Sequence, residues 1–96
     1  MKGYPIFWSP LAEETYLKTL TWILDKWTLR EAINFENKVN GLIEKLKIQK
    51  KLCPVSSTKN SLRRCVITPQ TSLVYQIKNK IIEIVVFIDN RSDHKY

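Results

Sequence analysis

The chain has 96 residues, 44% of them hydrophobic and 10% aromatic, which suits a single folded domain over 1–96 and excludes global disorder. No apolar run approaches the roughly 18 residues of a membrane span, and the start lacks the apolar stretch of a secretory signal, so we expect a cytoplasmic protein without a membrane partner. The net charge of +7 favours a polyanion or an acidic protein as partner, and we expect no small-molecule substrate.

The positive charge is confined to the second half of the chain. Residues 1–46 hold six basic and six acidic side chains, which cancel. Residues 47–96 hold ten basic side chains against three acidic ones. We therefore expect the second half to form an electropositive surface, with a general solubilising surface as the plainer alternative.

An edge strand and a helix are expected at the start of the chain. Residues 3–8 are aromatic and β-prone, and Pro5 suits the edge of a sheet. Ser9 is a good helix cap and Pro10 a good first helical residue. Apolar side chains then recur at steps of three and four residues, which predicts a helix that runs to about Lys26.

A second helix is expected to fold back along the first. Thr28 and Glu31 have the spacing of a capping box, so the helix should begin there. Its apolar stripe continues to Leu46, and its end should fray near Lys50. Because only about two residues separate the helices, we expect an antiparallel hairpin.

Three β-type runs follow Pro54, at about 62–68, 72–78 and 81–88. The short turns between them predict a three-stranded antiparallel meander. The last run is nearly all apolar, which is typical of a strand buried on both faces. The order β-α-α-β-β-β therefore predicts an α+β fold: the N-terminal strand and the meander form one curved sheet, and the helical hairpin lies on one face of it.

The sequence offers no metal or cofactor site that we can identify. Cys53 and Cys65 lack ligand-like spacing, and one histidine does not complete a ligand set. Two cysteines could pair, but without a secretory signal we expect reduced thiols. A hydrolase that used His94 as its base is disfavoured, because that residue lies two positions from the end of the sequence.

The remaining candidates for binding chemistry are the basic side chains of the second half: Lys59, Arg63, Arg64, Lys78, Lys80, Arg91 and Lys95. An arginine can grip a phosphate with two parallel hydrogen bonds, so the arginines suit a polyanionic target. Plainer interpretations stand beside this one. Arg64 pairs across the sheet with Asp89 or Glu83, or Arg91 forms a local turn clamp with Asp93.

Five segments in this order and spacing resemble the RelE/ParE toxins of bacterial type II toxin–antitoxin systems, in the ParE-like branch. The segments are Trp8–Ala12, Leu42–Leu46, Leu62–Val66, Leu73–Ile77 and Phe87–Asp93. The last of them is similar to the ending of many ParE-like members, with His94 where proline is usual. The resemblance spans nearly the whole chain and depends on the order of the segments more than on any single one.

The resemblance implies a growth-inhibiting toxin that a cognate antitoxin neutralises. In the ParE-like interpretation, the chain poisons DNA gyrase and is not an enzyme. The antitoxin is then expected to contact the groove between the hairpin and the sheet together with the basic strands, and an acidic, amphipathic segment would complement the charge.

The alternative is a RelE-like, ribosome-dependent mRNA endonuclease that needs no metal. Arg64 lies on the strand where the family places a catalytic arginine, so it would supply the cation. The positions of the nucleases' late histidine or tyrosine fall near Asn90 and Arg91, which are poor acid–base catalysts. His94 and Tyr96 would replace them only if the tail folds back. Whether the chain is an enzyme thus stays open.

A third interpretation is a DNA- or RNA-binding module without toxicity. It ranks last because the sequence has no recognition-helix signature. The three tryptophans all lie in the neutral half, so we expect packing in the core or the hairpin rather than base stacking for Trp8, Trp22 and Trp27.

Overall fold

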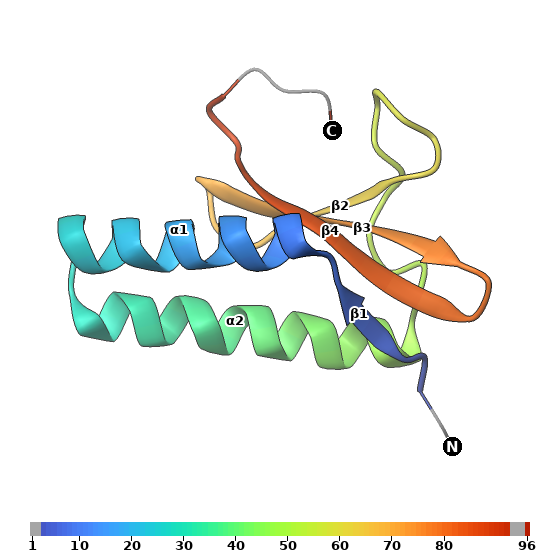
Figure 1. The fold of residues 1–96 in the computed structure, drawn as a ribbon, viewed down its shortest axis with the longest axis horizontal. Coiled ribbons are helices and arrows are strands. Elements are labelled where there is room, and N and C mark those ends of the chain that lie inside the picture. Colours follow the sequence, from blue (N-terminus) through green and yellow to red (C-terminus); the bar gives the residue numbers. More distant parts are fainter. Residues whose placement is uncertain (1–2, 93–95) are drawn as a thin grey trace.

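The computed structural model describes residues 3–92 and 96 of the chain. In chain order its elements are β1 (Ile6–Trp8), α1 (Pro10–Lys26), α2 (Leu29–Ile48), β2 (Arg63–Val66), β3 (Thr71–Lys78) and β4 (Ile81–Asp89). The strands form one sheet in the order β1-β4-β3-β2, and both helices lie on one side of it (Figure 1). The predicted α+β fold is confirmed, including the antiparallel pairing of β2 with β3 and of β3 with β4.

The first strand joins the sheet at its edge, as Pro5 suggested. It pairs in parallel with β4 and with no other strand among the described residues. β4 therefore lies between β1 and β3, which explains why its sequence is apolar on both faces. The Ile82 amide donates a hydrogen bond to the Pro5 carbonyl over 2.9 Å and so begins this parallel pairing.

Both helices begin at the residues that the capping signals predict. The Ser9 hydroxyl accepts a hydrogen bond from the Ala12 amide over 2.9 Å, and the Thr28 hydroxyl accepts one from the Glu31 amide over 3.1 Å. Each bond satisfies an amide that the first helical turn leaves without a partner. Only Trp27 and Thr28 separate the helices, so they form the expected hairpin.

A β-bulge in β4 decides which of its side chains face the helices. Val74 pairs with Val86 but Tyr75 pairs with Ile84, so Val85 is an extra residue in the strand. Ile84 before the bulge and Phe87 after it both face the helices. In a regular strand, residues three positions apart would face opposite sides. Val86 instead joins a separate apolar cluster on the opposite face of the sheet.

The main core fills the space between the hairpin and the sheet. Four aromatic rings meet there: Trp8 stacks on Phe87 with ring centroids 5.5 Å apart, and Tyr16 lies 5.2 Å from Phe87 and 6.1 Å from Phe35. Helix α1 is also bonded to β4 by polar groups, since the Phe87 amide donates to the Thr15 hydroxyl over 2.9 Å. The packing expected of Trp8 is thus present in the core.

The expectation of two reduced cysteines is wrong, because Cys53 and Cys65 form a disulfide. After α2 the chain turns back beside β2, where the Arg64 amide donates to the Pro54 carbonyl over 3.1 Å and Val55 makes an isolated bridge with Arg63. This return brings the two cysteine Cα atoms to 5.4 Å, within the usual range for a disulfide. The separation of 12 residues in the sequence does not reveal such a return.

Truncation of the residue after the bulge tests this description of the core. Replacing Phe87 with alanine removes a nearly buried ring that contacts Trp8 and Tyr16. We expect Phe87→Ala to lower the free energy of unfolding by about 3–5 kcal/mol, measured by urea denaturation. The control is Val66→Ala in β2, whose side chain is 69% exposed, and it should change stability by less than about 0.5 kcal/mol. Equal losses in the two variants would contradict this packing.

Candidate functional site

The sheet face opposite the helices carries a small apolar cluster bordered by polar residues. The buried members of the cluster come from β3, β4 and the loop before β2: Leu62, Val74, Val86 and Ile88. Arg64 pairs with Val74 in the register of β2 and β3, and strand alternation places its side chain on this face. We call this surface the open face.

The guanidinium of Arg64 is held on the open face by a neutral amide. Arg64 Nη2 donates to Asn90 Oδ1 over 2.8 Å, and the hydroxyl of the fully buried Ser72 donates to the same oxygen over 2.5 Å. Asn90 Nδ2 in turn donates to the carbonyls of Thr68 and Pro69, each over 3.2 Å. Asn90 therefore fixes the position of Arg64 without cancelling its positive charge.

The cross-sheet ion pairs considered for Arg64 are not those that form. Asp89 instead pairs with Arg91, whose Nε and Nη2 donate to the two carboxylate oxygens over 3.1 and 2.9 Å. Glu83 accepts from Gln76 Nε2 over 2.6 Å and lies 3.5 Å from Lys78 Nζ. No sequence pattern indicated Asn90 as the partner of Arg64, because the two residues are 26 positions apart and come from β2 and the end of β4, with β3 between them.

Tyr96 folds back onto the open face. Its side chain packs against the apolar cluster, and its main-chain oxygen accepts a hydrogen bond from the Ser56 hydroxyl over 2.7 Å. The fold-back that the sequence did not demand is therefore present for Tyr96. The other tail residues named from the sequence, Asp93, His94 and Lys95, lie outside the described residues.

Arg91 lies away from Arg64, at the edge between the sheet and α1. Its guanidinium carbon is 5.8 Å from the centre of the Trp22 ring, which is a cation–π distance. The hydrogen bonds that Arg91 donates to Asp89, and the charge of that carboxylate, raise the pKa of Arg91 above its ordinary value. The local clamp on Arg91 is therefore made by Asp89, whereas the predicted partner Asp93 lies outside the described residues.

The other predicted basic residues do not gather around Arg64. The side chain of Arg63 donates to the Cys53 carbonyl over 2.7 Å, so it fastens the loop. Lys59 is exposed in that loop. Lys78 lies four residues along β3 from Val74, the partner of Arg64, which is about 14 Å, and Lys80 lies in the turn beyond it. The structure thus divides the predicted basic surface into separate regions.

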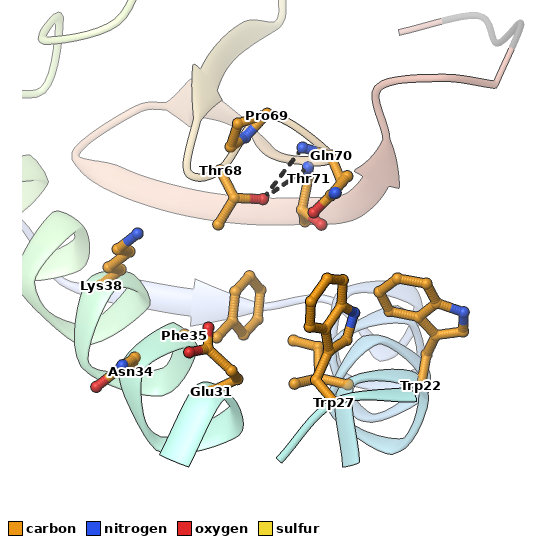
Figure 2. A pocket seen from close by; sticks show the side chains of 11 residues that line it. Trp22, Trp27, Glu31, Asn34, Phe35, Lys38, Thr68, Pro69, Gln70 and Thr71 are labelled. Carbon is orange, nitrogen blue, oxygen red and sulfur yellow. Dashed lines mark hydrogen bonds between the residues drawn. The ribbon is translucent and has the colours of Figure 1, made fainter. Parts of the chain in front are cut away.

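A second candidate site is an aromatic groove between the hairpin and the β2–β3 turn. The α1–α2 end of the hairpin projects past the sheet (Figure 1), and beside it lies a cavity of about 230 Å³. Figure 2 shows the rings of Trp22, Trp27 and Phe35 standing side by side and pointing towards the turn at residues 68–71. A neighbouring cavity of about 250 Å³ shares Trp22 with the first and reaches Arg91.

The groove leaves apolar surface open to solvent. Trp27 is 58% exposed and Trp22 is 38% exposed, so the expectation that these two rings are packed away is only partly met. Opposite them, the hydroxyl of Thr68 accepts hydrogen bonds from the Gln70 and Thr71 amides over 3.2 and 3.1 Å, which holds the turn in place. Concave apolar surface with a fixed polar rim is typical of a site that binds a partner.

The described residues show neither a cluster of metal ligands nor a membrane-spanning helix. Among residues 3–92 and Tyr96, no three histidine, cysteine or acidic side chains are grouped as metal ligands would be. Over the same residues, neither helix has the length and hydropathy needed to cross a membrane.

Several solved structures share this arrangement of elements, and some of them belong to toxin–antitoxin systems. A chain of the chromosomal ParDE TA system from P. aeruginosa matches with a TM-score of 0.75 and 12% identity, over 90% of this chain and 95% of that one. YoeB from Staphylococcus aureus matches with a TM-score of 0.64 and 18% identity, over 93% and 98%. The chain has the RelE/ParE toxin fold.

Other structures with the RelE/ParE fold extend this likeness. YafQ from E. coli matches with a TM-score of 0.61 and 17% identity, over 91% of this chain and 93% of that one. YafQ has also been solved in complex with the antitoxin DinJ, and that structure matches with a TM-score of 0.62. No protein-family model and no curated protein matches the sequence. At identities of 12–18%, this likeness shows the fold of the chain and does not identify its target.

Replacing the neutral amide that holds Arg64 tests whether its charge is available. In Asn90→Asp a carboxylate takes the place of the amide and should neutralise the guanidinium. We expect roughly fivefold weaker binding of a single-stranded oligonucleotide and a salt-dependence slope smaller by about 0.7, measured by fluorescence anisotropy. Asn40→Asp, at an exposed position of α2, makes the same change in net charge. The same loss in both variants would mean that only net charge matters.

Proposed function

We propose that this chain is the toxin of a type II toxin–antitoxin pair, that it acts in the cytoplasm, and that it inhibits DNA gyrase in the manner implied by its ParE-like features without being an enzyme. Support comes from the higher TM-score with the ParDE chain, 0.75, than with YoeB, 0.64. The ending at Asn90 and Arg91 supports the same branch.

The observation that carries this proposal is the identity of the groups around Arg64. Within the described part of the chain, the side chains that meet at this guanidinium are Asn90, which contacts it directly, and Ser72, which shares the same oxygen. Neither an amide nor a hydroxyl exchanges protons readily near neutral pH. Cleavage of RNA needs one group to activate the 2′-hydroxyl and another to protonate the leaving oxygen. Arg64 has a fixed position for binding an anion, but its neighbours are poorly suited to acid–base catalysis.

The proposed partner of the resting toxin is a cognate antitoxin, as DinJ is for YafQ. We place its contact on the aromatic groove, where Trp22 and Trp27 remain exposed. Lys38 lines the groove beside Glu31, and Lys18 lines the neighbouring cavity beside the paired Asp89 and Arg91. An amphipathic segment with acidic residues near Lys18 and Lys38 would complement this surface. The basic residues Lys59, Arg63, Arg64, Lys78, Lys80 and Arg91 remain candidates for target or antitoxin contacts.

A second candidate function, ribosome-dependent cleavage of mRNA, is favoured by the position of Tyr96. Its side chain packs on the open face, the same face as Arg64. A phenol on the same face as a fixed cation has the chemistry to donate a proton to a leaving group. In this alternative Arg64 stabilises the phosphate charge and Tyr96 transfers the proton, and ribosomal RNA is the polyanion next to the basic half.

Pulse-labelling of an induced bacterial culture distinguishes the two functions. For the gyrase proposal, thymidine incorporation should fall within minutes and DNA-damage signalling should rise while methionine incorporation continues. The matched variant is Tyr96→Phe, which keeps the ring in the apolar cluster but removes the phenol proton. It should inhibit growth as strongly as the unchanged chain. Loss of methionine incorporation first, together with relief of toxicity in Tyr96→Phe, would replace gyrase with the ribosome as the target.

A further inference from the structure

We infer that the Cys53–Cys65 disulfide is a thiol–disulfide exchange site, and that its reduction by a small dithiol loosens the loop beside the open face. The two cysteines differ in access: Cys65 is 3% exposed in the core, whereas Cys53 is only half-buried at the start of the loop. A reductant therefore reaches the Cys53 sulfur first, because exchange requires a thiolate to approach a disulfide sulfur directly.

The reaction at this site consumes one dithiol and breaks one bond. A thiolate of the reductant attacks Cys53 Sγ, and the Sγ–Sγ bond breaks with its electron pair on Cys65, which takes up a proton. The second thiol of the reductant, as a thiolate, then attacks the reductant's first sulfur, which is bonded to Cys53 Sγ. This releases Cys53 as a thiolate, which is also protonated. Two electrons and two protons pass from the dithiol to the protein, and the reductant leaves as a cyclic disulfide.

The disulfide lies beside contacts that connect the loop to the open face. Arg63 Nη1 donates to the Cys53 carbonyl over 2.7 Å, and the Arg64 amide donates to the next carbonyl, Pro54, over 3.1 Å. Further along, the Ser56 amide donates to the Leu62 carbonyl over 2.7 Å, and the Ser56 hydroxyl holds Tyr96. The covalent link thus anchors a segment that touches Arg64 on one side and Tyr96 on the other.

Reduction leaves these hydrogen bonds in place but removes the bond that keeps their partners together. Tyr75 supplies the remaining anchor from the core, since its hydroxyl donates to the Lys50 carbonyl over 2.8 Å and accepts from the Cys53 amide over 3.4 Å. The loop then opens more often as a local unit, whereas the parallel pairing of β1 with β4 is unaffected. The consequence for toxicity rests on the proposed function, but the opening of the loop does not.

Amide hydrogen exchange of the full chain, with and without dithiothreitol, tests this inference. Reduction, confirmed by titration of two free thiols, should speed exchange of the Arg64 and Ser56 amides roughly tenfold to a hundredfold. The Ile82 amide, bonded to Pro5 at the opposite edge of the sheet, should keep its exchange rate. The double variant Cys53→Ser with Cys65→Ser should exchange fast at Arg64 whether or not dithiothreitol is present.

Three results would overturn the inference. The disulfide could resist dithiothreitol until a denaturant is added, which would make it a permanent structural link. Reduction could leave the Arg64 and Ser56 rates unchanged, or it could raise the Ile82 rate by the same factor, which would indicate global rather than local opening. None of these readouts uses growth inhibition, so failure of the proposed function would leave this test unaffected.

Discussion

The extra residue in β4, Val85, is the constraint on which both faces of the sheet depend. Because of it, Ile84 and Phe87 face the helices while Val86 and Ile88 face the other way. The bulge is also where α1 is attached: the Ser9 hydroxyl donates to the Val85 carbonyl over 2.7 Å, and the Ser9 amide donates to the Ile84 carbonyl over 3.0 Å. One serine therefore caps the helix and fixes it to the strand at the bulge.

The open face exists because β4 changes its alternation at that point. Val86 and Ile88 support Val74 and the folded-back Tyr96, and Asn90 follows β4 where it can hold Arg64. The Arg64 guanidinium is therefore held in a fixed position by the neutral side chain of Asn90. Such a group binds anionic surfaces well, and within the described part of the chain the side chain that accepts its hydrogen bond is an amide rather than an acid–base group, which is why we favour a toxin that binds its target over one that cleaves it.

Local sequence signals predicted the helices and strands, but they did not predict the contacts between residues that are distant in the sequence. The starts of both helices could be read from Ser9 and Thr28, because a cap is formed by residues that are close in sequence. The bulge at Val85 could not be predicted, because the run 81–88 is apolar on both faces and so shows no change in the alternation of polar and apolar residues. The Arg64–Asn90 contact and the Cys53–Cys65 disulfide depend on strand register and on the course of a loop, which no local pattern records.

The most direct test uses the purified chain with two separate targets: gyrase with supercoiled DNA, and ribosomes that carry a defined mRNA. If the chain poisons gyrase, we expect cleaved DNA to accumulate in proportion to the added chain while the mRNA stays whole. Intact DNA together with mRNA cut on the ribosome would contradict this expectation, and would make Arg64 and Tyr96 parts of a nuclease site.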